Sequence, residues 1–323
     1  MNILVVGGAG YIGSHMVKAL VEAGHATTVF DSLVTGHRDA VHPAAEFVFG
    51  DLADRPRLDR LLVRGFDGVM HFASFIQVGE SVSNPAKYYR NNLCNSLNLL
   101  DALATSGCGR LIFSSTAAIF GNPRHAMIDE HHPCEPINSY GRSKWMVEQA
   151  LADYDRAHNL KSVCLRYFNA AGAAPDASLG ERHTPETHLI PLILQAVAGR
   201  RPPIEVFGDD YDTPDGTCIR DYIHVMDLCD AHLLALERLI AGGDSAAFNL
   251  GNGQGFSVRE VIAAVERITG HTVPYSIAPR RPGDPSRLVA DARLAINEIG
   301  WKPQFSGLDT IIADAWRWEC HRP

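Results

Sequence analysis

A glycine-rich run directly after a short apolar stretch constrains this chain more than any other feature. Residues 2–6 (NILVV) have the composition of a buried strand, and residues 7–13 (GGAGYIG) follow at once. Glycines at this spacing allow a tight turn and bring bare backbone N–H groups to the start of the next helix, where a pyrophosphate binds. Because a helical pattern follows at Ser14–Ala23, we interpret the run as a dinucleotide-binding turn.

Four further strands continue the alternation of strand and helix. We expect them at 26–30, 46–49, 67–73 and 110–116, and the longest helical pattern between them covers 85–104. This order predicts an α/β fold with a doubly wound parallel Rossmann sheet.

The carboxyl edge of such a sheet is where open α/β folds bind ligands. The residues expected at that edge are Asp31, Asp51, Ala73 and Ser114 to Thr116. Asp31 follows the second strand, about 20 residues beyond the glycines, where a carboxylate accepts from ribose hydroxyls and repels a 2′-phosphate. NAD is therefore favoured over NADP.

A tyrosine and a lysine one helical turn apart follow this sheet. Tyr140 and Lys144 share a helix face in the sequence YGRSK, and Asn138 or Ser139 is the expected N-cap. A phenol titrates near about pH 10, so it acts as a base near neutrality only where a nearby cation stabilises its anion. A bare Y-x-x-x-K is usually a surface pair, but beside the strand ends named above it predicts a catalytic site.

The second half of the chain changes character at residues 173–185, a loop of small and polar residues. We expect a helix from Leu189, a turn into a short strand at 202–208, a helix over 223–240, a strand over 247–251, and a helix that a Ser257/Glu260 capping box opens and Gly270 ends. The expected organisation is an NAD-binding domain at 1–172, with returning segments near 220–250, and a smaller α/β substrate-binding lobe within 173–323.

Composition argues against several classes of function. A net charge of −8 without a Lys/Arg-rich block gives no support to a nucleic-acid partner, and no apolar run approaches the ~18 residues that suggest a membrane span. Seven scattered cysteines without a C-x-x-C motif indicate reduced thiols in a cytoplasm. His131-His132 lie in a Pro-flanked loop and His183/His188 in a stretch without nearby Cys, so we expect exposed or hydrogen-bonded histidines and no metal site.

The chain resembles the extended short-chain dehydrogenase/reductases over nearly its whole length, and among them the UDP-glucose 4-epimerase family. The motifs that carry the resemblance are 7–15 (GGAGYIGSH), 71–73 (HFA), 78–81 (VGES), 140–144 (YGRSK), 165–169 (LRYFN), 207–211 (FGDDY), 215–217 (DGT), 220–228 (RDYIHVMDL) and 278–284 (APRRPGD). The last two are far more specific than the glycine run.

The resemblance implies a reaction and a set of site residues. Tyr140 would take the proton of the sugar 4-hydroxyl while hydride passes from C4 to NAD, Thr116 would hydrogen-bond the same oxygen, and Lys144 would lower the pKa of Tyr140 and hold the nicotinamide ribose. The 4-keto sugar would then turn over and take the hydride back on its other face. The cofactor-binding residues implied are Gly7, Gly10, Tyr11, Ile12, Gly13, Asp31, Asp51, Leu52, Phe72, Ala73, Asn91, Ser114, Tyr140, Lys144 and Phe168. The substrate-binding residues implied are Thr116, Tyr140, Asn169, His188, Leu189, Val206, Phe207, Arg220, Arg281, Asp284 and Leu288.

Three positions depart from the family pattern. Ala118 stands where many relatives carry Thr, and Ile76 replaces a lysine of some relatives, which places more weight on Asn91 and the backbone in cofactor binding. Leu288 stands where a Tyr narrows the sugar pocket of glucose-restricted relatives, so UDP-N-acetylglucosamine is a further candidate substrate.

Other functions on this scaffold remain open at this stage. Epimerases of UDP-xylose/arabinose or UDP-glucuronate handle sugars that differ only near C5. A sugar-nucleotide 4,6-dehydratase needs an Asp-Glu pair after Thr116, where this chain has Ala117-Ala118, and non-catalytic NAD-binding relatives typically lose the Tyr or the Lys. The resemblance also implies a homodimer, with helices 85–104 and 140–157 as the candidate interface.

Overall fold

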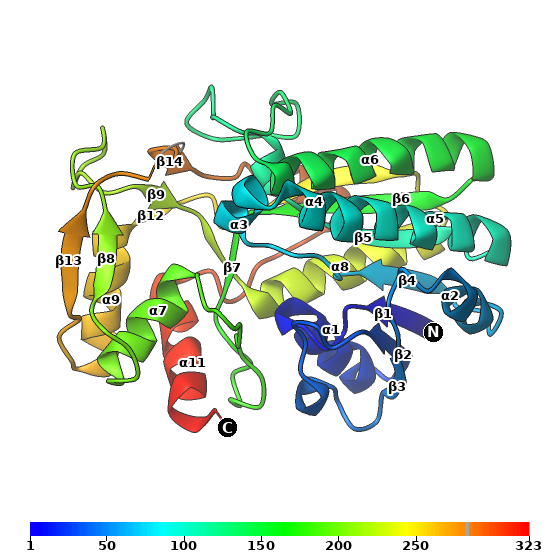
Figure 1. Ribbon diagram of the computed structural model, residues 1–323, viewed down its shortest axis with the longest axis horizontal. Coiled ribbons are helices and arrows are strands. Elements are labelled where there is room, and N and C mark those ends of the chain that lie inside the picture. The colour runs from blue at the N-terminus through cyan, green and yellow to red at the C-terminus, as the bar shows by residue number, and fades with distance from the viewer. Residues whose placement is uncertain (282–283, 323) are drawn as a thin grey trace.

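The computed structural model describes residues 1–281 and 284–322, so Pro282 and Gly283 of the 278–284 motif, and Pro323, lie outside the described residues. A parallel sheet of seven strands forms the centre of the molecule (Figure 1). Its strands are β1 (Asn2–Val6), β2 (Ala26–Asp31), β3 (Glu46–Phe49), β4 (Gly68–His71), β5 (Arg110–Thr116), β6 (Lys161–Tyr167) and β11 (Ala246–Leu250). They lie in the order β11-β6-β5-β4-β1-β2-β3, with every neighbouring pair parallel. The predicted doubly wound Rossmann sheet is confirmed.

The strand order reverses at β1, which pairs with β2 on one side and β4 on the other. Such a reversal opens a crevice at the carboxyl ends of the two strands. Gly7 follows β1 there with a φ of +81°, and a Cβ on it would lie 2.5 Å from the Ala73 nitrogen just beyond β4. Only glycine allows the two chain segments to approach this closely.

Helices cover both faces of the sheet. Ile3 and Val5 of β1 pack with α1 (Tyr11–Glu22) and α8 (Val225–Ile240), whereas Leu4 and Val6 pack with α2 (Arg55–Leu62), α5 (Asn95–Ser106) and α6 (Ser139–His158). Alternate side chains of a strand point to opposite faces, so the continuous apolar run of β1 fills both cores. Figure 1 shows α5 and α6 lying side by side along one face.

Further elements complete the fold. They are α3 (Val78–Ser83), α4 (Pro85–Tyr88), a π-helical turn (Tyr89–Cys94), β7 (Asn169–Ala171), α7 (Leu189–Val197), β8 (Ile204–Phe207), β9 (Ile219–Arg220), β10 (Tyr222–His224), β12 (Phe256–Ser257), α9 (Val258–Thr269), β13 (Tyr275–Ala278), β14 (Arg287–Leu288), α10 (Arg293–Ile299) and α11 (Leu308–His321), with short 3-10 turns at 38–40 and 117–119. Of these, α7, α9 and α11 enclose a core of their own around Ile193, Val265 and Ile311.

Several local signals in the sequence are confirmed. The Asn138 side chain accepts from Gly141 N and caps α6, and Ser257 and Glu260 form the capping box of α9. Gly270 ends that helix in the left-handed region, at a φ of +72°, as expected of a C-terminal glycine.

Other boundaries were predicted wrongly. α1 begins at Tyr11 rather than Ser14, because Gly10 already serves as its N-cap. The helix expected over 85–104 is interrupted by the π-helical turn, and β10 occupies the first residues of the helix expected over 223–240. β4 is shorter than 67–73, ending at His71, so Phe72 and Ala73 lie in the crevice as loop residues.

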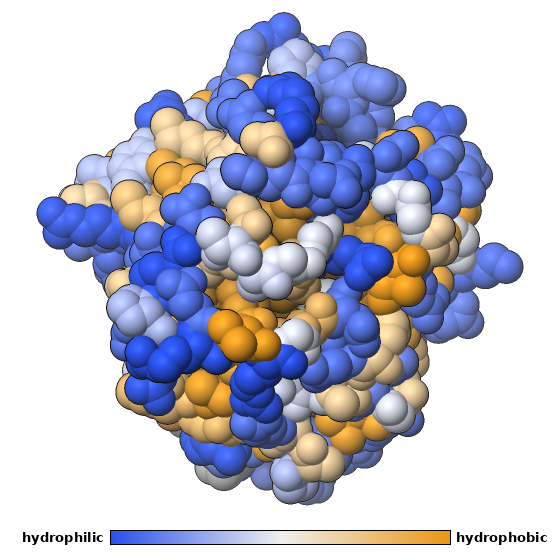
Figure 2. Space-filling view, turned by 90° about the vertical axis from the view of Figure 1, so that its right-hand side faces the viewer, coloured by the Kyte–Doolittle hydropathy of each residue, from blue (hydrophilic) through white to orange (hydrophobic). Residues whose placement is uncertain are grey.

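Among the described residues, no helix is both long enough and apolar enough to cross a bilayer. On the face that lies to the right in Figure 1, hydrophilic side chains surround smaller apolar areas (Figure 2). All seven cysteines are free thiols, three of them buried.

Candidate active site

The glycine loop is packed so tightly that its shape depends on the absence of side chains. A Cβ on Gly13 would lie 2.2 Å from the Gly7 carbonyl oxygen, which places the first turn of α1 directly against the loop. Asp31, at the end of β2, accepts from Ala9 N at 2.9 Å and from Leu33 N at 2.8 Å. Each of its oxygens keeps a further lone pair, so Asp31 orders the loop and still offers acceptors at the crevice.

Lys144 lies inside the molecule with its ammonium group at the end of β5. Its Nζ donates to the Ser114 carbonyl oxygen and to Ser74 Oγ, both at 2.7 Å, and lies 4.6 Å from the centre of the Phe113 ring. Lys144 is only 2% exposed, and burial lowers its pKa to about 7, against an opposing effect of Glu148. Lys144 therefore lies at the strand ends, as the sequence predicts.

Tyr140 reaches the same edge from the first turn of α6. A Cβ on Gly141 would lie 2.3 Å from the Ala118 carbonyl oxygen, so glycine lets this turn pack against the segment that follows Thr116. Burial raises the pKa of Tyr140, and a hydrogen bond with the Thr116 side chain opposes that rise. The pKa shift therefore differs in sign from the lowering expected from Lys144, because burial is its largest cause.

A buried ion pair that the sequence analysis missed lies behind these residues. Arg166 of β6 donates from Nη2 to Glu148 Oε2 at 2.6 Å, and the Ser115 hydroxyl also donates to Glu148. Glu148 stands one helical turn beyond Lys144 on the same face of α6. That i, i+4 spacing was the available signal, but the partner on β6 became visible only in the fold.

The segment after β4, next to the Ser74 that Lys144 contacts, is held by Asn92 of the π-helical turn. Asn92 accepts from Phe75 N and donates to Phe75 O, both at 2.9 Å. Asn91, the residue predicted to bind cofactor, is partly buried and donates to Asn92 Oδ1 at 2.9 Å. The two asparagines therefore fix the segment after β4, and Ile76 beyond it is 37% exposed. Single π-helical turns of this kind occur often at functional sites.

Four further predicted cofactor residues make contacts within the protein. Leu52 is 5% exposed and packs in the core beneath α2, and exposed Asp51 accepts from Ala53 N at 2.8 Å. Tyr11 donates its hydroxyl to the Gly172 carbonyl oxygen at 2.7 Å and so joins the glycine loop to the chain after β7. Ile12 packs against the core shared by α1 and α8.

The predicted nucleotide-binding residues lie on β7, β8, β9 and β14, at the start of α7, and on the loops beside them. The Arg281 guanidinium lies 3.8 Å from the centre of the Phe207 ring, and Arg220 forms an ion pair with Asp284. Val206 is an exception among them. It is 2% exposed and packs in the core around α7 and α9, on the opposite face of β8 from Phe207, so its side chain is not placed to stack on a base.

Two other predicted substrate residues lie close to this group. Leu288 of β14 is in register with Arg220 and packs, with Phe168, against the small apolar cluster around Phe120. Asn169 donates from Nδ2 to the Asp221 carbonyl oxygen at 3.1 Å, which ties the start of β7 to β10.

His188 precedes Leu189, the first residue of α7, and is not an isolated side chain. Glu181, His183 and Glu186 lie around it. Burial opposes a charge on His188, but Glu181 and Glu186 outweigh it and raise its pKa to about 10. The expectation of exposed or hydrogen-bonded histidines did not foresee this cluster.

Comparison with known proteins places this geometry in a family. Residues 3–251 match the model of the NAD dependent epimerase/dehydratase family. The UDP-glucose 4-epimerase of Streptococcus mutans is 51% identical over 326 aligned residues, covering 100% of this chain and 98% of that protein.

Solved structures agree with that comparison. The crystal structure of UDP-glucose 4-epimerase from Brucella ovis in complex with NAD matches with a TM-score of 0.96 and 51% identity, covering 98% of this chain and 97% of that one. The enzyme from Bifidobacterium longum in complex with NAD+ and UDP matches with a TM-score of 0.95 and 37% identity, covering 100% of this chain and 99% of that one. The chain therefore belongs to the NAD dependent epimerase/dehydratase family.

Proposed function

We propose that this chain interconverts UDP-glucose and UDP-galactose by NAD-dependent oxidation and re-reduction at C4 of the sugar. The observation that carries the proposal is the meeting of Tyr140, Thr116 and Lys144 at the carboxyl end of β5. Similarity along the whole chain to proteins named UDP-glucose 4-epimerase supports the same reaction.

The crevice fits a dinucleotide on the evidence of its own packing. Side chains at Gly7 or Gly13 would fill the loop, so the backbone N–H groups at the start of α1 stay open to a pyrophosphate. Asp31 suits a ribose hydroxyl, and Lys144 and Asn91 lie at the nicotinamide end of the proposed site. Bound NAD supplies reversible acceptance of hydride from sugar C4.

The proton follows a closed path in this account. Tyr140 takes the proton of the sugar 4-hydroxyl, Thr116 hydrogen-bonds the same oxygen, and the positive charge of Lys144 stabilises the developing phenolate. Re-reduction returns the proton from Tyr140 to the oxygen at C4. Because the proton and the hydride are both returned, the reaction needs no external oxidant or base.

The same account requires a firmly held nucleotide and a loosely held sugar. Arg220 and Arg281 are cations suited to a diphosphate, and Phe207 offers an aromatic face for the base. The 4-keto sugar has to turn over between the two hydride transfers. We therefore propose that most of the substrate's binding free energy comes from contacts with its nucleotide. Leu288 leaves the sugar side wider than a Tyr would, and UDP-N-acetylglucosamine, UDP-xylose/arabinose and UDP-glucuronate are the alternatives to assay beside UDP-galactose.

An isotopic experiment tests this reaction. UDP-galactose deuterated at C4 should yield UDP-glucose that keeps the label at C4, and loss of label to free NADH would contradict the proposal. Tyr140→Phe should slow turnover by about 10²–10⁴-fold. Tyr154→Phe is the matched control, because this phenol lies on the same helix but donates to the carboxylate of Asp101 on α5.

We propose in addition that the enzyme is a cytoplasmic homodimer with an NAD-binding lobe at 1–172 and 220–250 and a substrate lobe in the rest of 173–323. The proposed interface is the surface of α5 and α6, where Met146 is 37% exposed. Met146→Glu would place a charge in that interface, and an unchanged sedimentation coefficient for the dimer would remove this assignment of the interface.

A further inference from the structure

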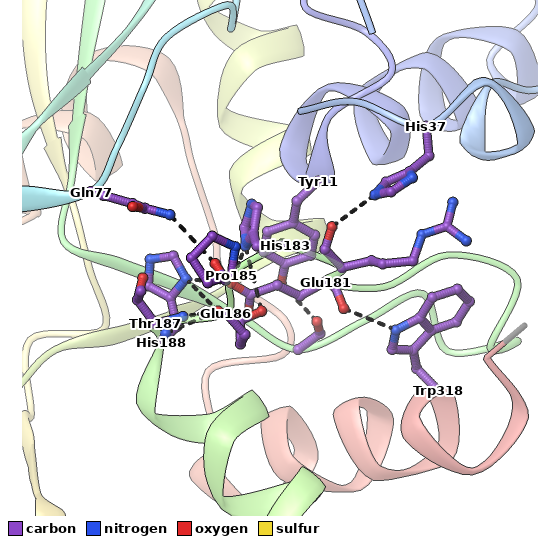
Figure 3. Close-up of polar contacts among 12 residues, drawn as sticks. Tyr11, His37, Gln77, Glu181, His183, Pro185, Glu186, Thr187, His188 and Trp318 are labelled. Atoms are coloured by element: carbon purple, nitrogen blue, oxygen red, sulfur yellow. Dashed lines mark hydrogen bonds and ion pairs between the residues drawn. The ribbon is translucent and has the colours of Figure 1, made fainter. Parts of the chain in front are cut away.

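Four ligand-type side chains meet in the loop between β7 and α7, outside the residues proposed for catalysis (Figure 3). His188 Nδ1 lies 2.6 Å from Glu181 Oε1 and 3.2 Å from Glu186 Oε1. His183 Nδ1 lies 3.1 Å from Glu181 Oε1 and 3.6 Å from Glu186 Oε2. One donor atom from each of the four residues lies within 4.8 Å of the other three.

The cluster leaves buried polar atoms unsatisfied. The Glu186 side chain is 6% exposed. Among the described residues its Oε2 has no hydrogen-bond partner, and it lies 3.6 Å from His183 Nδ1, at ion-pair distance but beyond hydrogen-bond distance. The Nδ1 of His183 is also buried without a partner in hydrogen-bond geometry, despite its ion-pair distance to both glutamates. Leaving such groups unpaired costs about 1–3 kcal/mol each, so a buried carboxylate oxygen without a partner points to a ligand.

We propose that Glu181, His183, Glu186 and His188 bind one divalent transition-metal ion, and that Zn²⁺ is the ion that fits best. Two imidazole nitrogens and two carboxylate oxygens form a donor set suited to zinc, whereas Mg²⁺ and Ca²⁺ prefer oxygen ligands alone. A tetrahedral zinc with bonds of about 2.0–2.2 Å places its ligand atoms roughly 3.4 Å apart. The distances between His nitrogens and Glu oxygens here run from 2.6 Å to 3.6 Å, on both sides of that value, and all four donor atoms lie within 4.8 Å of one another.

Charge favours the same assignment. Glu181 and Glu186 together carry a charge of about −2, which a divalent cation would neutralise in a buried place, and His183 and His188 would each release a proton on binding it. The ion would occupy the space into which Glu186 Oε2 points and would satisfy it together with His183 Nδ1.

The loop is held from outside in the arrangement that an ion would need. His37 Nε2 lies 3.1 Å from the Arg182 carbonyl oxygen, Trp318 donates to the Glu181 carbonyl oxygen at 3.2 Å, and Gln77 donates to the Pro185 carbonyl oxygen at 3.4 Å (Figure 3). These anchors come from three distant parts of the chain and fix the backbone that presents the four ligands.

The position of the cluster assigns the ion a structural role. The ring of Tyr11, in the glycine loop, meets the ring of His183 edge-on at 6.2 Å between centroids. His188 is the N-cap residue of α7. A metal here would lock the start of α7, which leads into the nucleotide side of the site, to the glycine loop.

The test uses untagged full-length protein freed of metal with a chelator and then titrated with Zn²⁺ alone. Calorimetry and elemental analysis should show one tightly bound zinc per chain. Glu186→Gln should weaken binding by more than the about 10–100-fold that loss of an outer hydrogen-bond partner costs a metal site. His125→Gln is the control, because it removes an exposed histidine outside the cluster and should leave binding unchanged.

A second measurement keeps the proposal testable if Glu186→Gln fails to fold. Crystals of the unaltered protein grown with Zn²⁺ should show an anomalous difference peak at the zinc edge among the four side chains. Absence of stoichiometric binding, equal affinity in Glu186→Gln, loss of binding in His125→Gln, or a peak elsewhere would each overturn the proposal. None of these measurements depends on epimerase activity, so the proposed function stands or falls separately.

Discussion

Glu148 of α6 and Arg166 of β6 form an ion pair buried behind Tyr140 and Lys144. The Nη2 and Oε2 atoms are 2.6 Å apart, and the side chains are 8% exposed for Arg166 and 4% for Glu148. Because Glu148 also acts on Lys144 by raising its pKa, this pair connects the stability of the fold with the electrostatics of the proposed site.

Removing the carboxylate should therefore be costly. Glu148→Gln leaves the Arg166 guanidinium buried without its counter-charge, and we expect a loss of about 3–5 kcal/mol in the free energy of unfolding. Glu46→Gln, which breaks an exposed pair with Arg64, should cost no more than about 1 kcal/mol. Urea denaturation of both variants measures the contrast, and equal losses would show that burial does not set the strength of this pair.

Gly7→Ala tests the close approach at the switch point of the sheet. The variant should lose about 1–2 kcal/mol of stability from its left-handed backbone and about 1–3 kcal/mol more from overpacking against Ala73, and it should be purified without retained NAD. Gly65→Ala is the matched control, because its φ of +77° is similar but a Cβ there meets nothing within 4 Å. Identical stability and NAD content in the two variants would contradict the packing argument.

Lys144 should give stability a specific pH dependence. Its pKa in the folded chain is about 7, below the ordinary lysine value of 10.5, so between these values the unfolded chain binds a proton that the folded chain does not. The unfolding free energy of the unaltered protein should therefore rise with pH relative to Lys144→Met, by about 1.4 kcal/mol per pH unit. Denaturation of both proteins between about pH 8 and 10 measures the difference.

The test is whether the unfolding free energy of the unaltered protein, relative to Lys144→Met, rises with pH. Burial is the main cause of the shift, with Glu148 and Cys164 opposing it. A stability difference that stays flat across this range would mean that the buried lysine keeps its proton.

Two neighbouring arginines should differ in their effect on substrate binding. Arg281, stacked on Phe207, is assigned to the diphosphate, so Arg281→Gln should raise KM for UDP-galactose by about 10–100-fold, the equivalent of one charge-assisted hydrogen bond. Arg280 is already paired with Asp210, and Arg280→Gln should leave KM nearly unchanged. Steady-state kinetics of both variants measure KM. Equal changes in KM would contradict the assignment of Arg281 to the diphosphate.

The parts of the fold that the sequence predicted well depend on local chemistry. The Asn138 cap, the Ser257/Glu260 capping box and the glycine loop are specified by residues a few positions apart. The π-helical turn could not be predicted in this way, because Asn92 is held by Phe75, 17 positions away. The same limit applies to Glu148, whose partner Arg166 lies on another element.

Two sites show where tertiary packing decides which side chains meet. Val206 and Phe207 are both apolar, and only the burial of β8 against α7 and α9 determines which side chain faces outward. His183 and His188 gave a signal in their spacing with Glu181 and Glu186, but that spacing becomes a cluster only because His37, Gln77 and Trp318 fold the loop back on itself.

The most direct test of the central claim is conversion of UDP-galactose to UDP-glucose by the purified protein with no NAD added. A closed redox cycle on retained NAD predicts turnover under these conditions without net formation of NADH. Activity that appears only when NAD is supplied, and that accumulates NADH in proportion to the sugar consumed, would contradict the account and make the protein a dehydrogenase.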